Sequence, residues 1–247
     1  MRTPRDAVIT AGGRVGGAFA RAIGTDVKGL GRVRDATMLQ RAIAAARGAG
    51  ALRIAVVGGA EVREASDGTI DKLIPEHPSG AANVRAALAS WAEDGPLLYL
   101  ASDMPYVDAD ALRDFIDRVP EGVLAMPLAE ESAYARRFPN APPHGICLAG
   151  ERVSNGGAFV IPAGARMRVD AFAARLFDAR KSAWKMAALL GLPLLADFAT
   201  RRLSIARLEA HALRVVGLPA IAIRAAAPEL AFDCDTAADY EYACAHA

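Results

Sequence analysis

The stretch Ala7-Val8-Ile9-Thr10-Ala11-Gly12-Gly13-Arg14-Val15-Gly16-Gly17 organises the 247-residue chain. A short apolar run, typical of a strand, leads into a loop that holds four glycines. Because glycine has no side chain, the backbone N–H groups of such a loop can approach a phosphate closely. Arg14 in the loop and Lys28 beyond it supply positive charge for an anion. The stretch therefore predicts a nucleotide site at the end of the first strand.

Composition indicates a soluble globular protein. Hydrophobic residues make up 53% of the chain, and 29 basic and 28 acidic residues leave a formal net charge of +1. Such a balance gives no global field for a nucleic acid or a membrane surface, so we expect neither as a partner. The length suits one α/β domain with a full core, and we expect a single domain over residues 1–247.

The cysteines and the apolar runs predict a cytoplasmic location. Three cysteines are an odd number, and they lack the spacing of a metal site: Cys147, Cys234 and Cys244. That usage fits a reducing compartment. The first residues have no signal-peptide pattern, and the longest later apolar run, Met186–Ala196, is broken by Gly191 and Pro193 and is too short to span a bilayer.

The first half of the chain alternates between strand and helix patterns, which is typical of an α/β protein with parallel strands. Thr37 and Gln40 have the spacing of a capping box, and Asp108 is a second predicted helix cap. Strands are predicted at Ala7–Thr10, Leu52–Val57, Leu97–Ala101 and Val123–Met126, and helices at Ala18–Ile23, after Thr37, at Asn83–Trp91 and after Asp108.

The residue composition of the chain changes after Met126. Residues 129–158 are rich in charge, proline and glycine, and we expect 129–200 to form an acceptor-facing insertion on the same sheet. Beyond 158 the pattern predicts strands at Ala158–Ile161, Pro219–Arg224 and Leu230–Cys234, and helices at Ala171–Phe177, Ala183–Leu190, Ser204–Leu208 and Ala237–Ala245.

Two familiar phosphate-binding loops do not fit the opening stretch. Gly12 and Gly17 have the glycine spacing of a Walker A loop, but Ala18-Phe19 stand where Lys and Ser/Thr are needed. A dinucleotide-binding fingerprint requires an acidic residue at the end of the second strand, and that strand ends in Gly58-Gly59 instead.

Four segments together resemble the MobA-like NTP transferases. They are Ala11-Gly12-Gly13-Arg14 with Lys28-Gly29-Leu30, Pro78-Ser79-Gly80 leading into Asn83, Ser102-Asp103-Met104-Pro105, and Phe232-Asp233-Cys234-Asp235-Thr236-Ala237-Ala238-Asp239. Their order and spacing suit nucleotidyltransferases related to molybdenum-cofactor guanylyltransferases and nucleotide-sugar synthases. The resemblance covers residues 7–127 and 228–245. Residues Val15–Gly24 depart from it, because the family's loop is more compact.

The resemblance implies a fold and a reaction. The fold is a Rossmann-like three-layer sandwich of the nucleotide-diphospho-sugar transferase type, similar to GT-A enzymes, with a mostly parallel sheet and helices on both faces. The reaction is the Mg²⁺-dependent transfer of NMP from an NTP to a phosphorylated small-molecule acceptor, with release of pyrophosphate.

The resemblance also implies residue roles. Ala11, Gly12, Gly13, Arg14 and Lys28 would hold the triphosphate. Asp103 and Asp235 would bind Mg²⁺, an ion that prefers oxygen ligands. Arg14, Lys28 and Asp103 would be catalytic, Gly80 and Asn83 would surround the nucleobase, and Asn155 would face the acceptor.

Each of these residues also has a structural alternative. Asp103 can cap the turn before Pro105, and Asp235 can cap the last helix. Lys28 can be a solvated loop lysine, and Asn155 can simply occupy a turn beside two glycines.

Two other functions stay open at this point, as does a homodimer. A GT-A-type glycosyltransferase would use a ready-made nucleotide sugar, and it normally carries an Asp-x-Asp after a central strand, where this chain has Asp103 and Pro105. A non-catalytic nucleotide sensor would tolerate loss of the metal carboxylates, yet Asp103 and Asp235 are both present. The nature of the base and of the acceptor does not follow from these residues.

Overall fold

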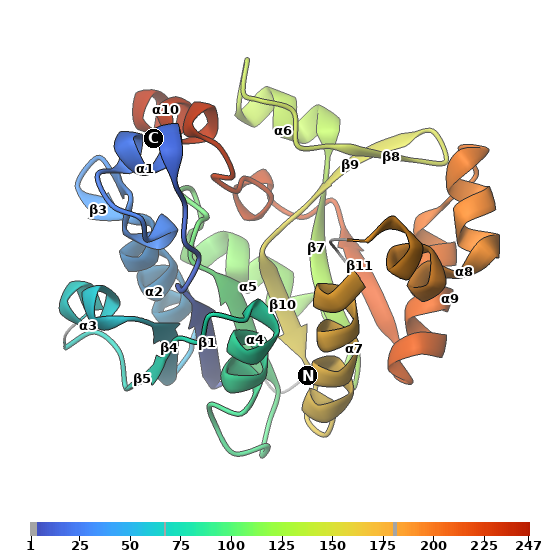
Figure 1. Ribbon diagram of the computed structural model, residues 1–247, viewed down its shortest axis with the longest axis horizontal. Helices are drawn as coiled ribbons and strands as arrows, with labels where there is room; N and C mark the ends of the chain where they lie inside the picture. The colour runs from blue at the N-terminus through green and yellow to red at the C-terminus, as the bar shows by residue number, and fades with distance from the viewer. Residues whose placement is uncertain (1–3, 67, 180–181) are drawn as a thin grey trace.

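One nine-stranded sheet runs through the molecule (Figure 1). The computed structural model describes residues 4–66, 68–179 and 182–247. The strand order is β5-β4-β1-β6-β10-β7-β9-β8, and β11 pairs with β7. The strands are β1 (Asp6–Thr10), β4 (Arg53–Gly58), β5 (Lys72–Pro75), β6 (Leu97–Ala101), β7 (Leu124–Glu130), β8 (Ile146–Leu148), β9 (Glu151–Asn155), β10 (Ala158–Ile161) and β11 (Ala220–Arg224).

Helices cover both faces of this sheet (Figure 1). Alternate residues of a strand point to opposite faces. In β1, Ala7 and Ile9 pack with helices α2 (Met38–Gly48) and α5 (Ala109–Asp117), whereas Val8 packs toward α4 (Gly80–Leu88) and α7 (Arg166–Ala179). Because both faces are covered, the strand reads as a continuous apolar run. The predicted three-layer α/β fold is confirmed.

The sheet is mixed in direction. Strands β5, β4, β1 and β6 are parallel, β10 is antiparallel to both of its neighbours, and β7 and β11 are parallel to each other. The register places Thr10, the last residue of β1, between Val57 and Ala101. The carboxyl ends of the parallel strands therefore meet at one edge, where ligands bind in open α/β sheets.

The predicted helix caps are confirmed. The Thr37 hydroxyl accepts from the Gln40 N–H, and the Gln40 side chain accepts from the Thr37 N–H, which completes the capping box of α2. The Asp108 side chain accepts from the Ala111 N–H at the start of α5. Satisfying these otherwise unpaired N–H groups fixes where each helix begins.

In the second half of the chain, the strands differ from the predicted strands in two places. A short hairpin, β8 and β9, extends the sheet beyond β7, where the sequence indicated no strands. The predicted strand at Leu230–Cys234 is wrong: Pro228–Leu230 forms a turn of 3₁₀-helix, η2, and the following residues form no strand. The Cys234 N–H donates to the carbonyl of Asp103 instead of to a neighbouring strand.

Helices in the second half begin and end elsewhere than expected. The segment predicted as Ser204–Leu208 continues to Val216, and the one predicted as Ala183–Leu190 continues past a kink at Gly191, where φ is 77°. No helix in the described part of the chain is long and apolar enough to cross a membrane. The remaining elements are α1 (Gly17–Ile23), η1 (Lys28–Leu30), β2 (Arg32–Val33), β3 (Ala36–Thr37), α3 (Ala60–Ser66), α6 (Glu131–Arg137), α8 (Ala183–Ala199), α9 (Ile205–Val216) and α10 (Ala237–His246).

Candidate active site

A pocket of about 670 Å³ lies at the carboxyl ends of β1, β5 and β6. It joins the glycine loop, the start of α4 and the residue that follows β6 by two positions. Its lining includes most of the residues that the sequence singled out and several that it did not: Thr10, Gly12, Gly13, Arg14, Lys28, Glu76, His77, Pro78, Gly80, Asn83, Val84, Tyr99, Ala101, Asp103 and Phe177.

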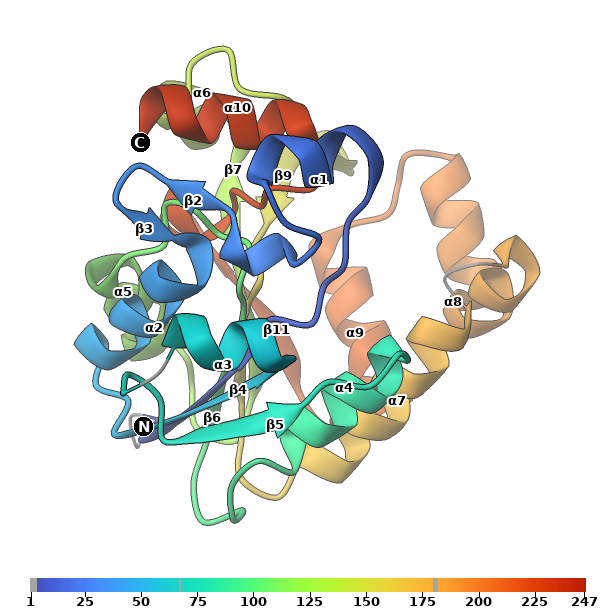
Figure 2. The same cartoon turned by 60° about the vertical axis from the view of Figure 1, so that its left-hand side comes forward.

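The glycine loop closes on itself across the long insertion. The Val15 N–H donates to the carbonyl of Asp26 at 2.8 Å, and the Lys28 N–H donates to the carbonyl of Gly13 at 2.9 Å. Helix α1 thus lies between two segments of the loop that are hydrogen-bonded to each other. Figure 2 shows it beside α10, where the rings of Phe19 and Tyr240 lie 6.4 Å apart. The unusual insertion therefore still brings Lys28 next to the glycines.

The loop offers backbone donors to the pocket. Among the residues that the structure describes, the N–H groups of Gly12 and Gly13 have no acceptor, whereas the N–H of buried Ala11 bonds to the carbonyl of Val57. A Cβ on residue 12 would lie 2.7 Å from Oε2 and 3.3 Å from Cβ of Glu76, so glycine lets the loop lie close to the end of β5. Gly12 and Gly13 line the pocket, whereas Ala11 is hydrogen-bonded to β4 and holds the start of the loop on the sheet.

Lys28 lies between two carboxylates. Its Nζ is 2.5 Å from Oδ2 of Asp103 and 2.5 Å from Oδ1 of Asp235. Burial lowers the pKa of this ammonium, but the charges and hydrogen bonds of the two carboxylates outweigh burial and raise the pKa above its usual value. Lys28 is therefore a cation. Its hydrogen bond to Asp235 joins two residues that are 207 positions apart.

A third carboxylate, Asp233, lies beside this cluster. Its Oδ1 is buried without a hydrogen-bond partner among the described residues. Burial, followed by the negative charges of Asp103 and Asp235, raises the pKa of Asp233 to about 8. A Cβ on residue 157 would lie 2.9 Å from the Cβ of Ala101, and one on residue 156 would lie 1.8 Å from the carbonyl oxygen of Leu230. The two glycines thus allow the ends of β6 and η2 to approach this turn closely.

The segment that carries Asp233 and Asp235 is not a strand, so strand alternation does not orient these two side chains. Asp235 does not cap α10 either: Thr236 is the cap, and Asp239 accepts from the N–H groups of Asp235 and Thr236. The side chain of Asp235 bonds to Lys28 and is 68% exposed, and Asp235 is not among the described residues that line the pocket.

Arg14 lies at the rim of the pocket but is held by three carboxylates. Its guanidinium bonds to Asp26 at 3.0 Å, to Glu61 at 3.1 Å and to Glu76. Hydrogen bonds to Glu61 and Glu76 raise the pKa of Arg14, and the bond to Arg14 lowers that of Glu61. In this arrangement Arg14 fastens the glycine loop to α3 and to the end of β5.

The opposite wall is formed by the start of α4 and by α7. The Asn83 side chain accepts from the His77 N–H at 2.6 Å and donates to the His77 carbonyl at 2.9 Å, so it holds the turn before α4. Phe177 packs on Gly80, where a Cβ would lie 2.4 Å from the ring. Sequence reasoning missed Phe177, because nothing in its own helix pattern distinguishes it from a core residue.

Asn155 lies outside this pocket and lines a separate cavity over β7 and β11. It is two residues before Gly157, whose carbonyl accepts from the Ala101 N–H at the end of β6. The predicted acceptor residue therefore borders the site without lining it.

The carboxylates fit a divalent cation that arrives with phosphate. No three carboxylate, thiol or imidazole side chains within the described ranges already surround one point as ligands. However, Oδ1 of Asp103 is buried without a partner among these residues, and Asp235 is exposed. Mg²⁺ typically binds one or two carboxylates together with substrate phosphates, so Asp103 and Asp235 suit it.

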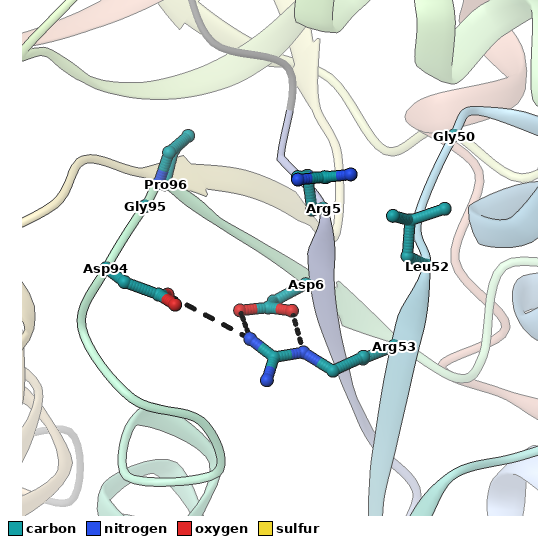
Figure 3. A pocket seen from close by; sticks show the side chains of 8 residues that line it. All are labelled: Arg5, Asp6, Gly50, Leu52, Arg53, Asp94, Gly95 and Pro96. Carbon is teal, nitrogen blue, oxygen red and sulfur yellow. Dashed lines mark hydrogen bonds and ion pairs between the residues drawn. The ribbon is translucent and has the colours of Figure 1, made fainter.

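A hollow of about 920 Å³ lies at the other end of the sheet (Figure 3). There the guanidinium of Arg53 bonds to both carboxylate oxygens of Asp6, at 2.6 and 2.7 Å, and lies 3.9 Å from Asp94. The charges of Arg53, Asp6 and Asp94 thus offset one another, and Arg5 is a further charged side chain that lines this hollow.

Comparison with known proteins agrees with this geometry. The model of the MobA-like NTP transferase domain matches residues 7–231. No curated protein matches the chain. Three solved structures share its architecture over nearly their whole length.

A hypothetical transferase from Thermus thermophilus is 26% identical with a TM-score of 0.83, covering 96% of this chain and 99% of its own. A nucleotidyl transferase from Methanothermobacter thermautotrophicus is 18% identical with a TM-score of 0.57, covering 98% and 96%. A Mycobacterium tuberculosis protein in complex with manganese is 20% identical with a TM-score of 0.54, covering 98% of each chain.

Proposed function

The chain belongs to the MobA-like NTP transferase family, and on that premise we propose that it transfers NMP from an NTP to a phosphorylated small molecule in a Mg²⁺-dependent reaction. A nucleotidyltransferase is what the family match supports. The metal, the acceptor and the roles of individual residues are our proposal.

One observation carries the proposal: Lys28 bridges Asp103 and Asp235 directly beside the glycine loop. A cation between two carboxylates, next to unpaired backbone donors, is the charge pattern that a metal-bound triphosphate needs. With the nucleotide bound, the ammonium of Lys28 would contact the phosphates, and Asp103 and Asp235 would hold Mg²⁺. Bound Mg²⁺ would neutralise charge on the phosphate oxygens.

The reaction needs no covalent nucleophile from the protein. An oxygen of the acceptor phosphate forms a bond to the α-phosphorus, and the bond from that phosphorus to the bridging oxygen of the β-phosphate breaks. The electron pair leaves with pyrophosphate. The N–H groups of Gly12 and Gly13 and the ammonium of Lys28 stabilise the charge on the leaving group.

The nucleoside lies toward α4 and α7 in this proposal. Gly80 and the turn held by Asn83 shape one wall of the base pocket, and Phe177 covers it. An aromatic ring beside a nucleobase provides a stacking surface. Arg14 positions the loop and does not itself need to touch phosphate.

The proposed setting is the cytoplasm. All three cysteines are unpaired, which supports a reducing compartment. The proposed partners are an NTP and a small-molecule acceptor.

A pyrophosphate-release assay tests the proposal. The protein is incubated with each of the four common NTPs, Mg²⁺ and a panel of phosphorylated sugars and alditols. We expect metal-dependent release with at least one pair and a loss of about 10³-fold for Asp103→Asn, because a metal ligand becomes a neutral amide. Asp110→Asn, an exposed aspartate of α5, is the matched control.

The other outcomes identify the rival functions. Thermal stabilisation by NTPs without release for any acceptor favours a sensor. Stabilisation by nucleotide sugars but not by NTPs favours a glycosyltransferase. Equal release by the wild type and Asp103→Asn contradicts the proposed metal site.

A further inference from the structure

A second cavity, of about 290 Å³, lies between the sheet and helices α7 and α9. Strands β7 and β11 form its floor, and the two helices cover that part of the sheet (Figure 1). Protein cores are close-packed and hold few voids larger than a water molecule. A space of this size is comparable to small ligand pockets. Its lining includes Met126, Leu128, Phe159, Phe172, Leu208 and Ala222.

The cavity is apolar. Among its described lining residues, only Asn155 and Glu209 have charged or amide side chains. Oε1 of Glu209 accepts from the Ala222 N–H at 2.9 Å, so that carboxylate is committed to the edge of the sheet. An apolar cavity does not hold ions or stable clusters of water, but it does bind apolar molecules.

The side chains around the cavity keep accessible surface that a ligand would cover. Met126 and Phe159 point from the sheet toward covering helices, and Phe172 and Leu208 point from those helices toward the sheet, yet all four are only half-buried. Covering this surface would contribute the usual hydrophobic free energy of binding.

The cavity and the nucleotide pocket are neighbours on one face of the sheet. Tyr99 lines the pocket, Phe159 lines the cavity, and the two residues are paired in register on β6 and β10 with ring centroids 6.0 Å apart. Helix α7 contributes Phe177 to the pocket and Phe172 to the cavity. Thus one pair of rings and one helix separate the two spaces.

Asn155 connects the cavity with the carboxylates. It is paired in register with Leu128, and directly opposed residues of antiparallel strands share a face. Two residues further on, about 7 Å along an extended chain, Gly157 approaches Asp233. A molecule seated in the cavity with its polar end beside Asn155 would therefore have that end near the turn that approaches Asp233.

We propose that this cavity holds the apolar body of the acceptor. The acceptor is an amphiphile: a phosphate at one end, which reacts, and an aliphatic or alicyclic hydrocarbon of about ten heavy atoms, given the ~30 Å³ that a water-sized group occupies. The inference rests on the proposed nucleotidyl transfer, because that reaction defines the phosphate as the acceptor end.

The test uses methyl, n-butyl and n-octyl phosphate, each below its micelle concentration. Binding to the full chain is measured by calorimetry in the presence of Mg²⁺, and pyrophosphate release is measured with each NTP. We expect binding to tighten about fourfold per added methylene, as buried CH₂ groups predict, and kcat/KM for release to rise in parallel.

Two variants fill the cavity from different walls. Ala212→Phe on α9 and Ala222→Leu on β11 are expected to remove most of the gain from methyl to octyl phosphate and to leave binding of methyl phosphate unchanged. The matched control is Ala210→Phe, which adds the same ring on the exposed side of α9. Using two walls keeps the test valid if one variant fails to fold.

The outcomes separate the inference from the function on which it rests. Pyrophosphate release with some acceptor but no dependence on chain length overturns the apolar subsite and leaves nucleotidyl transfer standing. Chain-length-dependent binding without release for any NTP overturns the assignment of the ligand as acceptor. A gain with chain length that both filling variants retain places the alkyl chain elsewhere and also overturns the inference.

Discussion

The two ends of the central sheet both carry a hollow with charged side chains, but they use charge differently. At the amino end, Arg53 makes two bonds to the carboxylate of Asp6, whose side chain is 4% exposed (Figure 3). At the carboxyl end, one lysine is shared by two carboxylates, and the Oδ1 atoms of Asp103 and Asp233 are buried without partners among the described residues.

The difference shows why volume does not identify the site. The hollow at the amino end is the larger, at about 920 Å³ against about 670 Å³, yet the charge of Arg53 is already offset there by Asp6 and Asp94. Unsatisfied polar groups are unfavourable in a folded protein unless function retains them. In the proposed function, a metal-bound nucleotide would satisfy the carboxylates at the carboxyl end.

After Asp103→Asn, the largest effect is expected at Lys28. Lys28→Met removes the cation that stabilises the leaving pyrophosphate, and it leaves Asp103 without its partner. We expect a loss of about 10²-fold in kcat/KM for pyrophosphate release, the effect of one lost electrostatic contact. Lys72→Met on edge strand β5 is the control, and a Lys28→Met enzyme as active as this control would remove Lys28 from the reaction.

A smaller effect is expected at Phe177. Phe177→Ala removes the ring that covers the base pocket, so KM for the NTP should rise about tenfold while kcat changes little, given ~1–3 kcal/mol for stacking. Nucleotide titration with both proteins measures this. Phe198→Ala, an exposed aromatic of α8, should leave KM unchanged; if it raises KM equally, the ring has no specific role.

A still smaller effect is expected at Arg14. The guanidinium is partly exposed, so each of its ion pairs contributes less than about 1 kcal/mol. Arg14→Ala should loosen the glycine loop and raise KM for the NTP about three- to fivefold. Arg21→Ala on the exposed side of α1 is the comparison. A loss as large as that of Lys28→Met would show that Arg14 contacts phosphate directly.

The amino end should affect stability alone. Asp6→Ala leaves Arg53 without its main partner, so we expect Tm to fall by roughly 3–6 °C. Pyrophosphate release per folded molecule should stay at the wild-type level, because this pair lies at the opposite end of the sheet. Thermal unfolding and pyrophosphate-release assays on the same preparation check both expectations. A loss of turnover per folded molecule would contradict the expectation that the amino end of the sheet affects stability alone.

The sequence predicted most of the first half of the fold and much of the site. Gly12, Gly13, Lys28, Gly80, Asn83 and Asp103 all line one pocket. Local signals sufficed because each residue ends or begins a regular element with a clear apolar period or a cap. Their meeting follows from parallel strands whose carboxyl ends share one edge.

The sequence failed where long-range contacts decide. Apolar residues suggested a strand at Leu230–Cys234, but the Cys234 N–H donates to the carbonyl of Asp103 from outside the sheet. The β8–β9 hairpin is short and lies at the edge of the sheet, where its pattern is weak. The surroundings of Phe177 and Asp233 are formed by residues that are distant in the sequence, so their own segments gave no signal for them.

The sequence by itself determined the family and the three-layer fold and indicated the glycine loop as the candidate phosphate loop, because these depend on local patterns that survive without knowledge of neighbours. The tertiary structure alone decided that the inserted α1 folds aside, that Arg14 is held by carboxylates, and that Lys28 bridges Asp103 and Asp235. Such contacts join residues up to 207 positions apart. A charge acquires its role from the charges around it, and only the folded chain brings those together.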